Sequence, residues 1–280
     1  MAIDLHTHST ASDGTLTPTD VVRAAYAAGL TALALSDHDS VEGVAEALAA
    51  GRTLGLTVVP ALELSAEHES GLSVHILGYF IDHTDPDLLA YLAELRGVRR
   101  SRARQMVDAL RSDGYDVNFN AVMARSDGGA VGRVHVAQAL VAAGRVHSIR
   151  EAFERLIGEG RPYYVRKPVP GPAEVVATVR AAGGLAVLAH PAVNGTAHLV
   201  RELAGAGLEG LEALHGQHST AECEEMTRLA MRMNLVVTGG SDFHGENAGH
   251  TAIGTGNVPD SVLNALLERA GARARRLQAN

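Results

Sequence analysis

Short apolar runs and longer amphipathic runs alternate along most of the chain. The apolar runs are rich in Val, Leu and Ala and lie at 3–5, 31–36, 56–64, 73–80, 185–189, 210–215 and 235–242. Near-continuous apolarity is typical of strands that are covered on both faces. Amphipathic runs at 17–29, 41–55 and 171–184 separate several of these segments. Strands that alternate with helices predict an α/β barrel or a parallel sheet with helices outside.

Local start and stop signals support the first of these helices. Thr17 is a good capping residue, Pro18 suits the first helical position, and Asp20 stands where a capping box places an acidic residue. Gly29 follows the last apolar position and is typical of a helix end. The signals therefore predict a helix within 17–29.

The alternation is interrupted between residues 85 and 165. Segments 85–114, 133–143 and 149–158 have helical patterns, and no convincing strand lies among them. We predict that 85–165 is a helical insertion that covers the barrel mouth. The barrel is then formed by 1–84 and 166–280, and the chain length suits a single α/β barrel.

Polar side chains of the metal-binding types recur where the predicted strands end. These residues are His6, His8, Asp37, His38, Glu63, His75, His190, Glu212, His215, Asp242 and His244. The carboxyl ends of parallel barrel strands open on one face, so we expect these side chains to converge there. Burying so many titratable groups without a cation would be costly. The pattern therefore favours a metal cluster.

Several short motifs in a fixed order resemble those of the PHP (polymerase and histidinol phosphatase) family. They are HTH at 6–8, SDG at 12–14, SDHD at 36–39, Glu63, His75, AHP at 189–191 and SDFH at 241–244. Any one of them would be a common accident, but their order and number make the resemblance specific. It implies a distorted seven-stranded (β/α) barrel that holds two or three divalent ions at its mouth.

The resemblance also implies which residues bind each ion. It places His6, His8, Glu63 and Asp242 around one ion, Asp13, His38 and His244 around a second, and Glu63, His75 and His190 around a third. Asp37 would orient a ligand imidazole. Because the donors are nitrogen and oxygen only, we expect Mn²⁺, with Zn²⁺ or Fe²⁺ as alternatives.

Clustered divalent ions favour phosphoester hydrolysis, with an amidohydrolase as the nearest enzymatic alternative. A phosphate substrate requires cationic side chains, whereas a carbonyl substrate does not. Arg133 and His135, in a segment that resembles a GRPH-like motif with Val134 in place of proline, are candidates for catalysis, and Arg133 and Lys167 for phosphate binding. His215 is a candidate for substrate contact, and His218 for protonating the leaving group.

Composition and charge narrow the choice of substrate and location. The chain of 280 residues has a net charge of −8, which argues against a general nucleic-acid coat or an anionic-membrane binder. It has one cysteine and no apolar leader or membrane-spanning run, so we expect a cytoplasmic protein without an obligate protein partner.

The segment SDGTLTP resembles stand-alone PHP proteins that act on nucleotides. We therefore expect a metal-dependent phosphoesterase that hydrolyses small nucleotide phosphate esters, such as 3′,5′-bisphosphonucleosides or the 5′ ends of short oligonucleotides. A histidinol-phosphate phosphatase and a non-catalytic PHP module remain alternatives.

Overall fold

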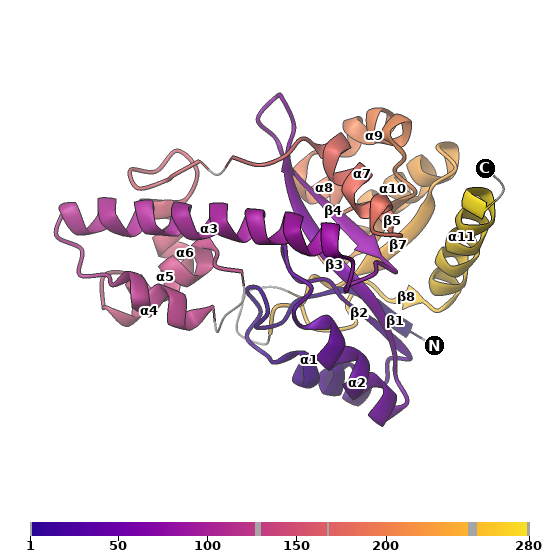
Figure 1. Ribbon diagram of the computed structural model, residues 1–280, viewed down its shortest axis with the longest axis horizontal. Coiled ribbons are helices and arrows are strands. Elements are labelled where there is room, and N and C mark those ends of the chain that lie inside the picture. Colours follow the sequence, from indigo (N-terminus) through magenta and orange to yellow (C-terminus); the bar gives the residue numbers. More distant parts are fainter. Residues whose placement is uncertain (1, 127–129, 167, 246–250, 279–280) are drawn as a thin grey trace.

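The structure is a computed structural model that describes residues 2–126, 130–166, 168–245 and 251–278. Its centre is an eight-stranded sheet that curls into a nearly closed barrel, with helices around the outside (Figure 1). The strands are β1 (Ala2–Thr7), β2 (Ala32–Leu35), β3 (Thr57–Glu67), β4 (Ser73–Tyr79), β5 (Leu185–Leu188), β6 (Gly210–His215), β7 (Val236–Gly240) and β8 (Val258–Pro259). The strand order is β7-β6-β5-β4-β3-β2-β1-β8.

β7 and β8 are the edge strands of the sheet, and the segment after β7 crosses the gap to the mouth end of β1. The Asp242 N–H donates to the His6 carbonyl at 2.9 Å, and the His8 N–H donates to the Phe243 carbonyl at 2.8 Å. These bonds place His6 and His8, at the end of β1, beside Asp242, which follows β7. The seven predicted strands are all present, and the two-residue β8, which the sequence pattern did not predict, pairs with the edge of β1 opposite β2.

One strand departs from the expected parallel arrangement. β4 runs antiparallel to both β3 and β5. The link between β3 and β4 is only residues 68–72, and a parallel connection needs a crossover of about a dozen residues or more. The reversal matters for the site, because it puts the first half of β4, which contains His75, at the mouth where the parallel strands end.

The side chains of β3 and β4 alternate between the barrel interior and the outer helices. Ala61 and Leu77 belong to the interior cluster of buried residues, whereas Leu62 belongs to the cluster beneath the outer helices. Since strand side chains repeat with period two, Glu63 and His75 share the interior face. The barrel interior is thus apolar at its centre and becomes polar at the mouth.

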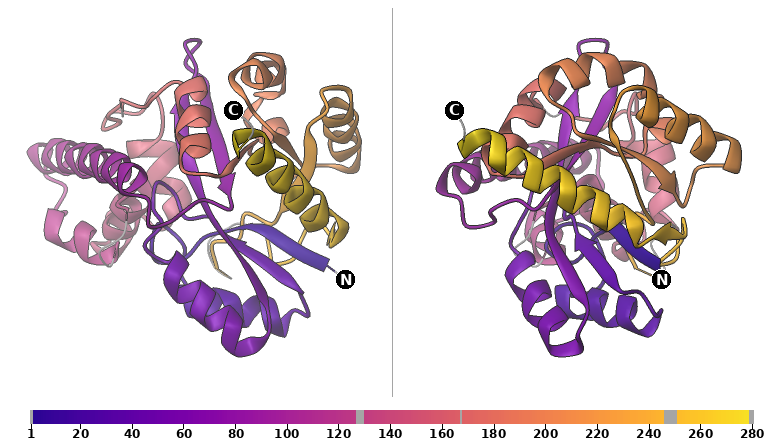
Figure 2. Two further views of the ribbon diagram at one scale, coloured as in Figure 1. Left: turned by 45° about the vertical axis from the view of Figure 1, so that its right-hand side comes forward. Right: turned by 90° about the vertical axis from the view of Figure 1, so that its right-hand side faces the viewer.

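The outer helices follow the strands much as the sequence predicts. They are α1 (Pro18–Ala27), α2 (Val44–Leu54), α7 (Pro172–Ala181), α8 (Pro191–Asn194), η2 (Ala197–Leu199), α9 (Val200–Ala206), α10 (Thr220–Arg232) and α11 (Ser261–Gln278). The Thr17 hydroxyl accepts the Asp20 N–H at 3.2 Å, so the predicted cap of α1 is present. Figure 2 shows α11 lying across the strands near β8. No helix in the described ranges is long and apolar enough to cross a membrane.

The segment predicted as an insertion forms a group of helices on one side of the barrel (Figure 1). They are α3 (Pro86–Ser112), α4 (Phe119–Arg125), α5 (Arg133–Ala142), α6 (Ile149–Ala152) and the π-helical turn η1 (Phe153–Ile157). They share their own cluster of buried side chains, including Met106, Leu110 and Leu140. Arg99 of α3 pairs with the buried Asp39 of the barrel at 2.5 Å, which ties the group to the loop after β2.

Candidate metal centre

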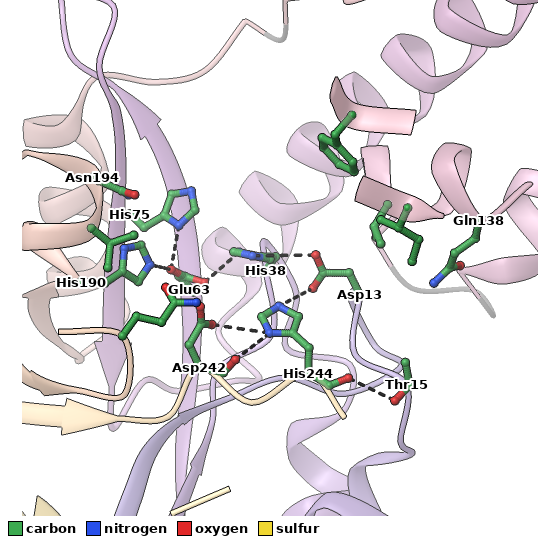
Figure 3. Close-up of a pocket in the computed structure, with 15 residues that line it drawn as sticks. Asp13, Thr15, His38, Glu63, His75, Gln138, His190, Asn194, Asp242 and His244 are labelled. Atoms are coloured by element: carbon green, nitrogen blue, oxygen red, sulfur yellow. Dashed lines mark hydrogen bonds and ion pairs between the residues drawn. The ribbon is translucent and has the colours of Figure 1, made fainter. Parts of the chain in front are cut away.

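The nine side chains predicted as ligands converge at the barrel mouth, where seven of them are labelled in Figure 3. Most of them lie at or just beyond the mouth ends of the strands, and one is carried by the loop after β1. The set is His6, His8, Asp13, His38, Glu63, His75, His190, Asp242 and His244. They belong to segments more than 230 residues apart, as the barrel topology requires.

Glu63 stands at the centre of the cluster and is fully buried. Its Oε2 atom lies 2.9 Å from Nδ1 of His38 and 3.4 Å from Nε2 of His8. Its Oε1 atom faces the other way, 2.9 Å from Nδ1 of His75 and 3.1 Å from Nε2 of His190. One carboxylate thus serves two groups of imidazoles, which is the geometry that a bridging ligand needs.

Two further carboxylates complete the arrangement. Asp242 Oδ1 lies 3.1 Å from Nε2 of His8 and 3.3 Å from Nε2 of His6. Asp13 Oδ1 lies 3.3 Å from Nε2 of His244. Within each group of possible ligand atoms, all lie within 4.8 Å of one another. The groups are His6, His8, Glu63 and Asp242; His8, Asp13, His38 and His244; His38, Glu63 and His75; and, behind these, His6, Glu212 and His215.

The donor atoms fit a divalent cation. Nε2 of His6 and Nδ1 of His8 are buried, yet make no hydrogen bond with the described part of the chain, and the short contacts of Glu63 Oε2 lack hydrogen-bond geometry. Buried polar atoms in proteins normally have a hydrogen-bond partner, so several buried donor atoms without one at a single place indicate a ligand site. Imidazole nitrogen and carboxylate oxygen are suitable ligands for Mn²⁺, Zn²⁺ and Fe²⁺.

Opposite charges dominate the electrostatics of the cluster. Burial raises the pKa of Asp242, but His6 and the other histidines lower it well below its usual value. Burial likewise lowers the pKa of His6, whereas Glu212, Glu63 and Asp242 raise it well above the ordinary range. Burial, and then the neighbouring His244, lower the pKa of His8 to about 3, so this ring is neutral and can offer a lone pair.

Glu212 contacts the cluster from the side away from the cavity. The sequence placed it at a strand end but indicated no role for it. Its carboxylate is fully buried, with Oε1 and Oε2 at 3.0 and 3.2 Å from Nδ1 of His6. Oε2 also accepts the backbone N–H of His190 at 2.8 Å. A carboxylate on the far nitrogen holds the ring with its other nitrogen free for a metal. No local sequence signal could reveal this pair, which is 206 positions apart.

Asp37 does not orient an imidazole as the sequence suggested. Its Oδ1 atom accepts hydrogen bonds from the Ser9 N–H at 2.8 Å and the Ser12 hydroxyl at 2.6 Å. Its Oδ2 atom accepts the Ser9 hydroxyl at 2.7 Å. Asp37 therefore fixes the loop after β1, and so the position of Asp13, rather than a histidine ring.

The backbone at two of the predicted ligands is strained. His190 and Asp242 have φ angles of 28° and 54°, in a region that side chains other than glycine rarely adopt. Such conformations cost about 1–3 kcal/mol and persist where surrounding contacts over-determine them.

At Gly240 a Cβ atom would lie 2.5 Å from the backbone nitrogen of His6. Only glycine permits that close approach of β7 to β1.

A cavity of about 380 Å³ opens directly in front of the cluster. Its floor includes Asp13, His38, Glu63 and His190, and its walls come from α5, α6, η1 and α8. A volume of this order is typical of small-ligand pockets. The helical segment and the barrel therefore enclose the space in which a substrate could reach the metal ligands.

A second cavity, of about 210 Å³, adjoins the first, and three arginines and three carboxylates line it. Arg99, Arg102 and Arg133 line it, together with Asp13 and His38 of the metal cluster. Burial and then the neighbouring Arg133 lower the pKa of Arg102 to about 10. Guanidinium groups gathered in a partly buried space form a site for an anion. Arg133 was predicted from the sequence, but Arg99 and Arg102 were not singled out.

The remaining predicted residues occupy less direct positions. Nδ1 of His135 accepts the Gly132 N–H at 2.8 Å, so this ring fixes the turn before Arg133. His215 and His218 are buried behind the cluster, and neither lines the two cavities. Nδ1 of His218 bonds to the Ala213 carbonyl at 3.1 Å. Lys167 lies outside the described residues.

Comparison with known proteins places this architecture in a family. The PHP domain matches residues 4–158. The chain belongs to the PHP domain family. It is 36% identical over 246 residues to a 5′-3′ exoribonuclease of Haemophilus influenzae, covering 86% of this chain and 89% of that protein. It is also 36% identical over 260 residues to a 3′,5′-nucleoside bisphosphate phosphatase of Chromobacterium violaceum, covering 89% and 91% of the two chains.

A solved structure has the same fold. It comes from Bifidobacterium adolescentis, was described as a proposed metal-dependent phosphoesterase, and superposes with a TM-score of 0.88 at 33% identity. The match covers 95% of this chain and 96% of that one. The helical segment is therefore included in the shared architecture and is not peculiar to this PHP protein.

Proposed function

We propose that this protein is a metal-dependent phosphoesterase acting on nucleotides that carry a second phosphate. The leading substrates are 3′,5′-bisphosphonucleosides and the 5′ ends of short RNA. Two kinds of evidence support the proposal: the activities named for the two relatives, and the cluster of imidazoles and carboxylates that could hold metal ions.

The observation that carries the proposal is the arginine-lined cavity beside the metal cluster. Arg99, Arg102 and Arg133 share it with Asp13 and His38. Arg99 pairs with Asp39, and Arg102 donates to the Val165 carbonyl. A second phosphate would bind the remaining N–H groups of the three arginines, whereas the carbonyl substrate of an amidohydrolase needs no such cations. The net charge of −8 is no obstacle, because the positive potential is local.

The metal ligands are proposed in three groups. His6, His8, Glu63 and Asp242 would hold one ion, Asp13, His38 and His244 a second, and Glu63, His75 and His190 a third, with Glu63 bridging. We propose Mn²⁺, with Zn²⁺ or Fe²⁺ as alternatives. Bound ions would lower the pKa of a water molecule toward neutrality and neutralise the phosphoryl oxygens.

The protein groups have separate tasks in this scheme. Glu212 holds His6 with Nε2 directed at Glu63 and Asp242. Arg133 and its neighbours would bind the second phosphate at a fixed distance from the scissile one. Residues 85–165 would act as a cap that limits access to small or end-threaded substrates. This cap role follows from the position of α5, α6 and η1 around the cavity.

A substrate panel with Mn²⁺ tests the proposal. It should include a 3′,5′-bisphosphonucleoside, a 5′-phosphorylated short RNA, a nucleoside monophosphate, histidinol phosphate and an amide or lactone. We expect the first two to give the highest kcat/KM. Preference for histidinol phosphate would overturn the substrate assignment, and activity on the amide or lactone alone would overturn phosphoester hydrolysis.

A further inference from the structure

The larger cavity extends beyond the metal cluster into a recess with a different lining. We define this recess by Val134, Gln138, Ile149, Phe153, Val193, Asn194 and Gln217. Its apolar members come from both the helical segment and α8. Val193 is 48% exposed, although it lines a cavity. Apolar side chains left open in a concave site are suited to cover by an apolar surface of a ligand.

Three carboxamides also line the recess. Gln138 comes from α5, Asn194 from the end of α8, and Gln217 from the segment after β6. Figure 3 shows Gln138 and Asn194 on opposite sides of the cluster. Each carboxamide can both donate and accept hydrogen bonds. A ligand of this recess needs an apolar surface for the apolar side chains and hydrogen-bonding groups for the carboxamides. A flat ring with polar edges offers both, since its faces are apolar and its rim carries donors and acceptors.

Phe153 links this recess to the arginine-lined cavity. Its side chain lines both spaces, and the guanidinium carbon of Arg133 lies 5.4 Å from its ring centroid. A nucleotide with a phosphate among the arginines would therefore pass Phe153 on its way to the recess. Proteins that bind unpaired nucleotides commonly stack a base on an aromatic side chain and bind its edge with polar groups.

We propose that the recess binds the nucleobase of the substrate, with Phe153 as the stacking surface and the carboxamides as hydrogen-bond partners. This inference rests on the proposed function, because the recess opens onto the metal cluster. Carboxamides can match either pattern of donors and acceptors, so the recess favours a base over no base but discriminates weakly among bases. Stacking on Phe153 also discriminates little among bases, because every base has a π-face.

Binding of two product-like ligands tests the proposal without requiring turnover. Adenosine 5′-monophosphate and ribose 5-phosphate share the phosphate and the sugar, and they differ only in the base. Calorimetry with the Mn²⁺-loaded protein should show about tenfold tighter binding of the nucleotide, the order expected for one stacked base. Phe153→Leu keeps an apolar side chain but removes the aromatic face, and should bring the ratio of the two affinities close to one.

Phe119→Leu is the matched control. Phe119 also lies under a guanidinium, with the Arg104 carbon 3.8 Å from its ring centroid, but it belongs to the core of the helical segment and lines neither cavity. This variant should keep the tenfold ratio. Gln138→Leu probes the recess independently of Phe153 and should reduce the ratio severalfold.

The outcomes separate this inference from the proposed function. Equal affinities in the unchanged protein would overturn the recess, as would a preserved ratio in both Phe153→Leu and Gln138→Leu. The substrate panel addresses hydrolysis independently. A protein that prefers the nucleotide but hydrolyses no phosphate ester would retain the base site and lose the proposed activity.

Discussion

Replacing Glu212 by Gln should weaken metal binding while leaving the fold in place. The side chain is fully buried and keeps its volume in the variant, but the two contacts to Nδ1 of His6 at 3.0 and 3.2 Å lose their charge. A hydrogen bond to a charged group is worth about 1.5–3 kcal/mol. A carboxamide can also donate to Nδ1, which would move the proton of the ring to Nε2, the atom that faces Glu63 and Asp242.

We expect about 10–100-fold weaker Mn²⁺ affinity, the range typical when a group that orients a metal ligand is lost. Calorimetric titration would give affinity and stoichiometry, and thermal unfolding in chelator would report the metal-free fold. Glu224→Gln is the control, because its exposed pair with Arg228 at 3.4 Å should contribute little. Unchanged affinity in a folded Glu212→Gln protein would refute the reasoning.

Three further predictions concern the site and the cap. Asp242→Ala should abolish turnover and lower Mn²⁺ stoichiometry while circular dichroism stays unchanged, because the barrel core is apolar; full activity would contradict its ligand role. Arg102→Ala should reduce kcat/KM more on bisphosphates than on monophosphates, and equal losses would remove it from the anion site. Burial lowers the pKa of His244, but Asp13 raises it more, to about 9 overall, so the ring is protonated at neutral pH. Mn²⁺ binding to this ring should therefore release a proton. Calorimetric binding heats that are the same in buffers of different ionisation enthalpy would refute this.

The secondary structure could largely be predicted from the sequence, because it depends on neighbours along the chain. Periodicity located the seven main strands, and the Thr17 cap correctly marked the start of α1. The direction of β4 was wrong in the parallel scheme, although the short link 68–72 already contained the reason. The two-residue β8 is too short to produce a periodic pattern, and only its pairing with β1 defines it as a strand.

By itself the sequence determined which side chains could bind metals, since their types and their places at strand ends are properties of the chain. Only the tertiary structure decided how they are used. In the structure Glu63 lies between two groups of imidazoles, and Glu212 contacts His6. Asp37 accepts hydrogen bonds from the loop after β1 instead of from a histidine. The tertiary structure also brought Arg99 and Arg102 of α3 beside Arg133 of α5. These contacts join residues that are distant in sequence, and their geometry follows from barrel closure and helix docking, which no local pattern contains.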